Sequence, residues 1–120
     1  MTEQEIRTIL NRQREYFATG ATLSRKFRAE QLGKLKASLQ RHEEELNAAL
    51  QQDLGKSRME SYMCEIGLTL SELTWMQKHL RGLMQEKRVP TPLSQFAAIS
   101  FRSPSPYGTV LIMSPWNYPV

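Results

Sequence analysis

Hydrophobic residues in the first ninety positions recur at steps of three and four, which is the spacing of amphipathic helices. Thr2 begins the first of these runs with the spacing of a capping box, and Gly20 ends it. A second helix is expected to start near Thr22. The acidic run at 43–45 suits the first turn of a third helix, which is expected to end at Gly55.

The longest apolar stripe lies between Ser57 and the proline-rich segment at 89–92. A glutamate follows Ser57 three residues later, so a second capping-box spacing begins there. The stripe consists of Met59, Met63, Ile66, Leu70, Leu73, Leu80 and Leu83. It predicts a helix of about seven turns that packs on one side and ends before the prolines, because proline lacks the N–H that a helix needs.

Two strand candidates follow the helices, at 97–102 and 109–114. The second contains the uninterrupted apolar run VLIM at 110–113, which is typical of a strand covered on both faces of a parallel sheet. Parallel strands need neighbours that are reached through crossover helices, and no residues after 120 supply them. The residues therefore predict an α/β fold, with a helical layer and the first strand of an unfinished domain.

Charge is distributed unevenly along the 120 residues. All twelve acidic residues lie at or before Glu86, and beyond it only Lys87, Arg88 and Arg102 are charged, which marks the main boundary of the chain. The single cysteine, Cys64, excludes an internal disulfide and suits a reducing compartment. Neither a signal peptide nor a membrane-spanning apolar stretch is present, so we expect a cytoplasmic protein without a membrane span.

The reactive side chains of the helices predict no active site of their own. Cys64 has no neighbouring histidine or cluster of cations to activate its thiol, so we expect an ordinary helical cysteine. His42 and His79 are isolated and lack partners at metal-ligand spacing, so we expect no metal site.

Two other function classes stay open at this point because the second helix is basic and the sequence pI is near 9.5. Its cations are Arg25, Lys26, Arg28, Lys34 and Lys36. They could bind nucleic acid, although acidic residues are interspersed and no recognition motif is present. A helical interaction module that dimerises would explain the helices, but neither the apolar strand nor the motif that ends the chain.

That motif is an aromatic turn between two prolines, SPWNYP at 114–119. In open α/β sheets, ligands bind beyond the carboxyl ends of the strands, which is where this turn is expected. A rigidly held carboxamide such as that of Asn117 can donate to an oxygen that gains negative charge. A packed turn in which Asn117 bonds backbone is the preferred interpretation on these residues alone.

A family resemblance changes this preference. PYGTVLIMSPWNYPV resembles the P-x-G-x-x-x-x-I-x-P-W-N-[FY]-P stretch that opens the dinucleotide-binding domain of the aldehyde dehydrogenase superfamily. QQDLGKSRMESYMCEI resembles the DLGKS…E…EI segment of its N-terminal helices. KRVPTPLSQFAAISFRSPSPYG is similar to the linker and first strand of its class 3, fatty-aldehyde-like branch.

The resemblance implies an α/β, aldehyde dehydrogenase-like fold, here an N-terminal helical layer plus the first strands of an incomplete parallel-sheet dinucleotide-binding domain. Residues 1–96 would be the N-terminal helices of the cofactor-binding domain. Residues 97–106 would be a strand of the oligomerisation arm. Residues 107–120 would be the first strand and active-site loop of the dinucleotide-binding domain.

The resemblance also implies roles for single residues. Asn117 would donate its side-chain amide to the aldehyde oxygen, Tyr118 would border the substrate tunnel, and Tyr62 would line the tunnel mouth. Three residues would contact the nicotinamide side of NAD or NADP: Ser114, Pro115 and Trp116.

The resemblance implies an N-terminal fragment of an NAD(P)-dependent aldehyde dehydrogenase, which oxidises an aldehyde to a carboxylic acid. The parent enzyme would be a cytoplasmic homodimer that binds no nucleic acid. The family's nucleophilic cysteine, general-base glutamate and ribose-binding lysine belong to segments after residue 120. We therefore expect the 120 residues alone to be catalytically inactive.

Overall fold

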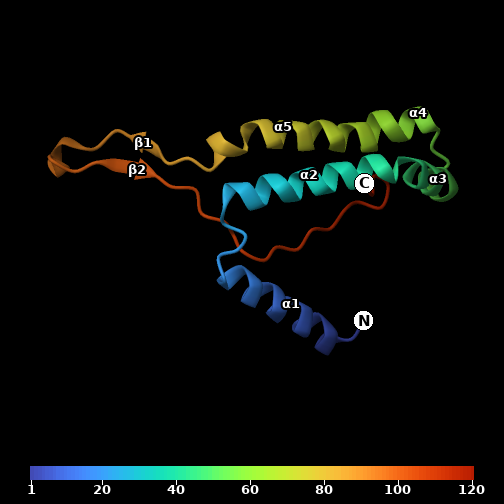
Figure 1. The fold of residues 1–120 in the computed structure, drawn as a ribbon, viewed down its shortest axis with the longest axis horizontal. Coiled ribbons are helices and arrows are strands. Elements are labelled where there is room, and N and C mark those ends of the chain that lie inside the picture. The colour runs from blue at the N-terminus through green and yellow to red at the C-terminus, as the bar shows by residue number, and fades with distance from the viewer.

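The helices of the first part of the chain begin and end largely at the residues that the sequence predicts, in a computed structural model that describes residues 1–120 (Figure 1). They are α1 (Glu3–Ala18), α2 (Arg25–Arg41), α3 (Glu43–Leu54), α4 (Arg58–Ser61) and α5 (Gly67–Leu83). Thr2 forms the predicted capping box of α1, with both hydrogen bonds present. Ser24, rather than Thr22, caps α2, so that helix begins slightly later than predicted.

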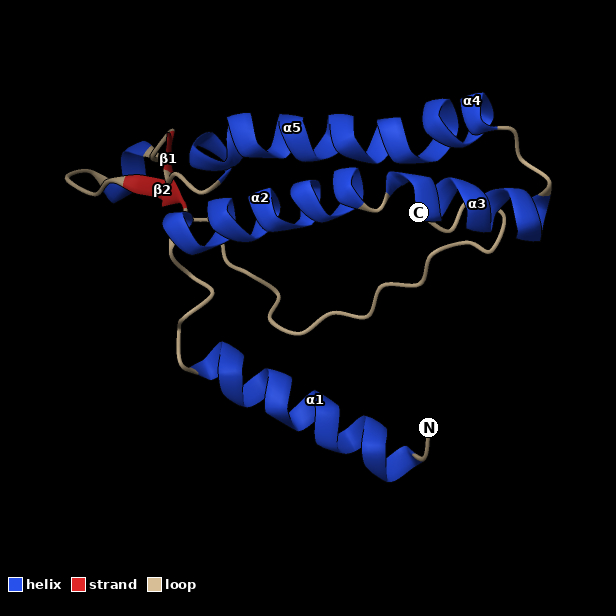
Figure 2. Cartoon of the chain, turned by 45° about the vertical axis from the view of Figure 1, so that its right-hand side comes forward, coloured by secondary structure: helices blue, strands red, loops and turns tan.

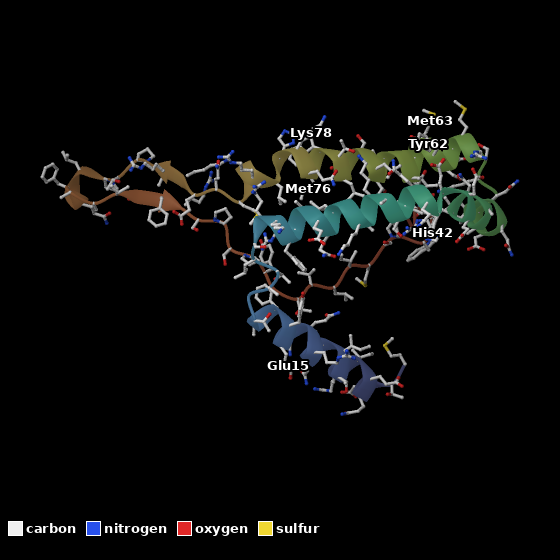
Figure 3. All side chains as sticks on the ribbon, in the orientation of Figure 1. Glu15, His42, Tyr62, Met63, Met76 and Lys78 are labelled. Carbon is white, nitrogen blue, oxygen red and sulfur yellow. The ribbon has the colours of Figure 1, made fainter.

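The predicted long helix is present, but a π-helical segment, η1 (Tyr62–Ile66), interrupts it between α4 and α5. In this wider turn the Gly67 N–H bonds the carbonyl of Tyr62, five residues earlier. The inserted residue shifts the buried face, so Ser61 and Glu65 are buried while Met59 and Met63 are exposed. The prediction that these two methionines pack on the apolar face was therefore wrong. In Figure 3 the labelled Met63 lies at the α4 end of this helix, on its outer side.

Helices α2 and α5 lie side by side and antiparallel, with α3 at one end of the pair (Figures 1 and 2). The main apolar cluster lies at that end and consists of Leu50, Ile66 and Leu70, with Leu39, Leu46 and Val120 packed against it; Leu73 and Leu80 are buried further along α5. Figure 2 shows α1 diverging from the α2–α5 pair, and none of its residues is buried. This cluster therefore joins α2, α3, η1 and α5 to Val120.

A short antiparallel hairpin projects beyond the opposite end of the helix pair (Figure 1). It consists of β1 (Lys87–Val89) and β2 (Ser100–Arg102), with Lys87 opposite Arg102. The prediction of a strand at 97–102 is confirmed in its second half. The strand β1 was missed because three residues before a proline are too few to show an alternating pattern.

The second predicted strand, at 109–114, is absent, and that prediction was wrong for this structure. The segment is extended but has no strand beside it, since β1 and β2 pair only with each other. Its apolar residues are 60–83% exposed instead of covered on both faces: Val110, Leu111, Ile112 and Met113. A strand exists only through its ladder of hydrogen bonds, so an apolar run without partners stays an extended tail.

Candidate functional site

The tail that follows β2 returns along α2 and ends near α3 (Figures 1 and 2). It thereby brings the SPWNYP segment against the helical core. Trp116 and Asn117 form the corner of a tight turn, which the Tyr118 N–H closes with a 3.1 Å bond to the Pro115 carbonyl. Pro115 is the first residue of this turn and supplies the carbonyl that accepts the closing bond.

A buried ion pair lies beneath this turn. The Lys56 ammonium is 2.5 Å from Oε1 of Glu65, and the two residues are 8% and 2% exposed. Gly55 adopts φ 68° after α3 and its N–H bonds the Gln51 carbonyl at 3.0 Å, which ends the helix in the left-handed (αL) glycine motif; the Lys56 N–H bonds the Leu50 carbonyl at 3.4 Å. Lys56 is therefore fixed by a helix end, and Glu65 is fixed by the π segment.

Both members of the ion pair also hold the tail. The Lys56 ammonium donates to the backbone carbonyl of Asn117 at 2.7 Å and lies 3.8 Å from the centre of the Tyr118 ring. The second carboxylate oxygen of Glu65 accepts from the Val120 N–H at 3.0 Å. A buried ion pair is tolerated only when further hydrogen bonds satisfy both charges, and the tail supplies them. We call Lys56 and Glu65 the tail clamp.

The predicted site residues at the turn lie together on an exposed surface. The Asn117 side chain is exposed, and its carboxamide makes no hydrogen bond within the chain, whereas its backbone carbonyl is held by the clamp. The structure thus lacks the side-chain-to-backbone bond that the packed-turn interpretation requires. Trp116 is 89% exposed and Tyr118 about half exposed, so the residues on either side of Asn117 in the chain are both aromatic and accessible.

Tyr62 is not brought to this turn. It lies where α4 passes into η1 and lines a groove of about 560 Å³ between α2 and α5, which contains none of residues 114–118. Another groove, of about 630 Å³, is bordered by α1, α2, α5 and the 106–110 part of the tail, and it also excludes the turn. The turn is therefore an open surface feature here, without an enclosing pocket.

The remaining reactive groups form no second centre. No group of three or more His, Cys, Asp or Glu side chains could hold a metal ion. His42 lies 3.2 Å from Glu45, and His79 stacks on Trp75 with 4.2 Å between ring centres. None of the helices combines the length and the apolar character that a membrane crossing requires.

Similarity to known proteins identifies the family of this chain. The chain matches the aldehyde dehydrogenase family model over residues 1–120. This chain belongs to the aldehyde dehydrogenase family. It is 42% identical over 104 residues to the 4,4'-diaponeurosporen-aldehyde dehydrogenase of Staphylococcus aureus, covering 87% of this chain and 23% of that protein. It is 41% identical over 111 residues to aldehyde dehydrogenase family 3 member B1 of Homo sapiens, covering 92% of this chain and 24% of that protein.

A solved structure agrees with these relatives. The substrate-bound state of Staphylococcus aureus AldH superposes with a TM-score of 0.92 at 39% identity, covering 95% of this chain and 25% of that one. The chain thus spans about a quarter of the length of the aldehyde dehydrogenases that it matches. The expected resemblance to this family, including its class 3 branch, is confirmed by several family 3 relatives.

Sequence reasoning gave no role to the tail clamp, although both of its residues lie in the DLGKS…E…EI segment. One signal was available. Glu65 stands next to Ile66, on a helix whose apolar stripe passes through that point, and a carboxylate at the edge of a buried stripe needs a partner. Nothing local to the sequence identifies Lys56 as that partner.

Proposed function

We propose that this chain supplies the helical layer and the aldehyde-binding turn of an NAD(P)-dependent aldehyde dehydrogenase, which oxidises an aldehyde to a carboxylic acid. One observation carries the proposal: the Asn117 carboxamide is unbonded, while the backbone of the same residue is held by a buried ion pair. A donor that is free at its side chain and fixed at its backbone meets the requirement for stabilising a developing oxyanion.

The residues around Asn117 fit the remaining roles that family membership suggests. The exposed Trp116 ring, with Ser114 and Pro115 before it, offers a flat apolar surface for a nicotinamide ring. Tyr118 would border the aldehyde, on the other side of the amide donor. Bound NAD or NADP would supply the hydride acceptor, and the Asn117 amide would donate to the aldehyde oxygen as negative charge develops there.

The arrangement of domains is part of the same proposal. Residues 1–96 would supply the helices of a cofactor-binding domain together with β1, which pairs with β2 in the 97–106 segment of an oligomerisation arm. Residues 107–120 would supply the active-site loop and the segment that becomes the first strand. The exposed apolar run at 110–113 would join a parallel sheet built by further sequence, which would complete a Rossmann-like domain. Tyr62 would then line the mouth of the tunnel, in a cytoplasmic homodimer.

The 120 residues alone are proposed to lack activity. Cys64 is the single cysteine, and it is exposed on the π segment without a base beside it. No residue here matches the family's nucleophile or general base, so aldehyde oxidation by the purified chain would contradict this part of the proposal.

A chimera tests the proposal directly. Residues 1–120 replace the matching segment of Staphylococcus aureus AldH, and NAD(P)-dependent oxidation of an aldehyde substrate of that enzyme is measured. We expect Asn117→Ala and Asn117→Asp to lower kcat by about 10²–10³, because neither side chain can donate, while the KM for the cofactor changes little. Asn11→Ala, at an exposed asparagine of α1, is the matched control. If the Asn117 variants turn over as fast as the parent chimera, Asn117 has no part in the reaction.

A further inference from the structure

We infer that Lys56 and Glu65, the tail clamp, are positioning residues for the Asn117 carboxamide, an inference that rests on the proposed role of Asn117. The clamp holds the turn at two points that bracket this residue. Lys56 bonds the backbone carbonyl of Asn117 at 2.7 Å, and Glu65 accepts the Val120 N–H at 3.0 Å. The orientation of the peptide that carries the amide donor is therefore fixed from outside the turn.

The internal bonding of the turn is too weak to do this alone. Within residues 114–120 the hydrogen bond is the single one between the Tyr118 N–H and the Pro115 carbonyl. The surrounding side chains are mostly exposed, so packing adds little restraint. Preorganised donors stabilise a transition state because they need no reorganisation when charge develops, and a turn held by one bond would reorient.

Neither member of the clamp is available for proton transfer. The Lys56 ammonium carries three N–H groups, of which one meets Glu65 and one meets the Asn117 carbonyl, while the Tyr118 ring covers the ammonium at 3.8 Å. Both oxygens of Glu65 are engaged, one by Lys56 and one by Val120. With their polar groups occupied and their side chains buried, these residues act through the turn and not on the aldehyde.

The first test uses the 120-residue chain itself. We expect Lys56→Met to accelerate hydrogen exchange at the Tyr118 and Val120 amides, measured by NMR, because the turn loses its anchor. Lys34→Met is the control, since Lys34 forms an exposed ion pair with Glu30 at 3.1 Å on α2. Exchange at these amides that does not change in Lys56→Met would overturn the inference.

The second test measures turnover in the chimera with Staphylococcus aureus AldH. Lys56→Met is expected to lower kcat by about 100-fold, which a small misplacement of a catalytic group can cost, with the cofactor KM nearly unchanged. Lys56→Arg should recover most of the loss because it keeps the cation. The double variant Lys56→Met/Asn117→Ala should be hardly slower than Asn117→Ala alone, since Lys56 acts through that amide. If the double variant instead loses kcat by the product of the two single-variant losses, Lys56 acts independently of the Asn117 amide and the inference is overturned.

Folding is controlled by a variant that removes both charges. Lys56→Met leaves Glu65 buried without a partner, whereas Lys56→Met/Glu65→Gln leaves a neutral amide that still accepts from Val120. We expect this double variant to recover thermal stability without recovering kcat. Recovery of both would assign the clamp a merely structural role and overturn the inference. If Asn117→Ala has no effect, the proposed function fails; if Asn117→Ala is slow and a folded Lys56→Met is not, only the clamp inference fails.

Discussion

A single added methyl group at Gly67 tests the role of this glycine in closing the π segment η1. Gly67 closes that segment with its N–H, and a Cβ there would lie 2.7 Å from the Tyr62 carbonyl oxygen and 2.9 Å from Cε1 of the Tyr62 ring. The ring can rotate away, but the carbonyl belongs to the helix backbone and cannot move without breaking the turn. We therefore expect Gly67→Ala to destabilise the chain.

The magnitude follows from two opposing terms. In an unobstructed helix, alanine is favoured over glycine by about 0.8–1 kcal/mol. Overpacking typically costs about 1–3 kcal/mol, and a contact with backbone lies in the upper part of that range, so Gly67→Ala should lower the free energy of unfolding by about 1–2 kcal/mol. Gly82 is the matched control, because it lies in the same helix and a Cβ there meets nothing within 4 Å. Gly82→Ala should stabilise by about 1 kcal/mol.

Urea unfolding of the two variants, followed by far-ultraviolet circular dichroism, measures both effects against the parent chain. The two variants are expected to change the free energy of unfolding in opposite directions. Both are Gly→Ala changes, so their effects on the unfolded chain are nearly the same and cancel in the comparison. If Gly67→Ala stabilises as much as Gly82→Ala, an ordinary α-helical register runs through residues 62–67. The π segment, and with it the explanation for the exposed methionines, would then be refuted.

Two further predictions concern the stability of the α3–α4 connection. Gly55→Ala should lower the free energy of unfolding by about 1–2 kcal/mol because φ at this position is 68°, and Gly55→Asn should lower it less. The urea midpoints of both variants measure this. An alanine variant as stable as the parent would exclude the left-handed conformation. Arg58→Met breaks an exposed ion pair with Glu44 and should lower the free energy of unfolding by less than about 1 kcal/mol. Lys56→Met breaks the buried pair with Glu65 and should lower it by about 3–5 kcal/mol. Equal shifts of the two variants in thermal unfolding would contradict the burial of the clamp.

The elements that the sequence predicted well are those with local causes. The capping box at Thr2, the acidic first turn of α3 and the glycine at its end all act within a few residues, and each appears at the predicted place. The π segment escaped prediction because one inserted residue leaves the apolar pattern nearly intact on either side. Only the burial of Glu65 and the exposure of Met63 reveal the shift, and both are tertiary facts.

The strand at 109–114 failed for a different reason. The apolar run is strand-like by composition, but a strand is completed by neighbours, and no hydrogen-bonding partner lies beside it. The tail clamp is also non-local, since Lys56 and Asn117 are 61 positions apart. The sequence therefore predicted the residues of the turn, through the family motif, but not the contacts that hold the turn in place.

The use of charge to hold the turn follows from what the turn has to do. Val120 already packs on the apolar core, and burial of this kind keeps a chain end close without fixing its orientation, because the hydrophobic effect has no direction. Charge-assisted hydrogen bonds are directional, and those at the Asn117 carbonyl and the Val120 N–H set the plane of each peptide. A buried ion pair adds little to stability compared with apolar residues of similar volume. In the proposed function its value is geometric: the residue whose carbonyl Lys56 holds is the one whose amide would donate to a developing oxyanion.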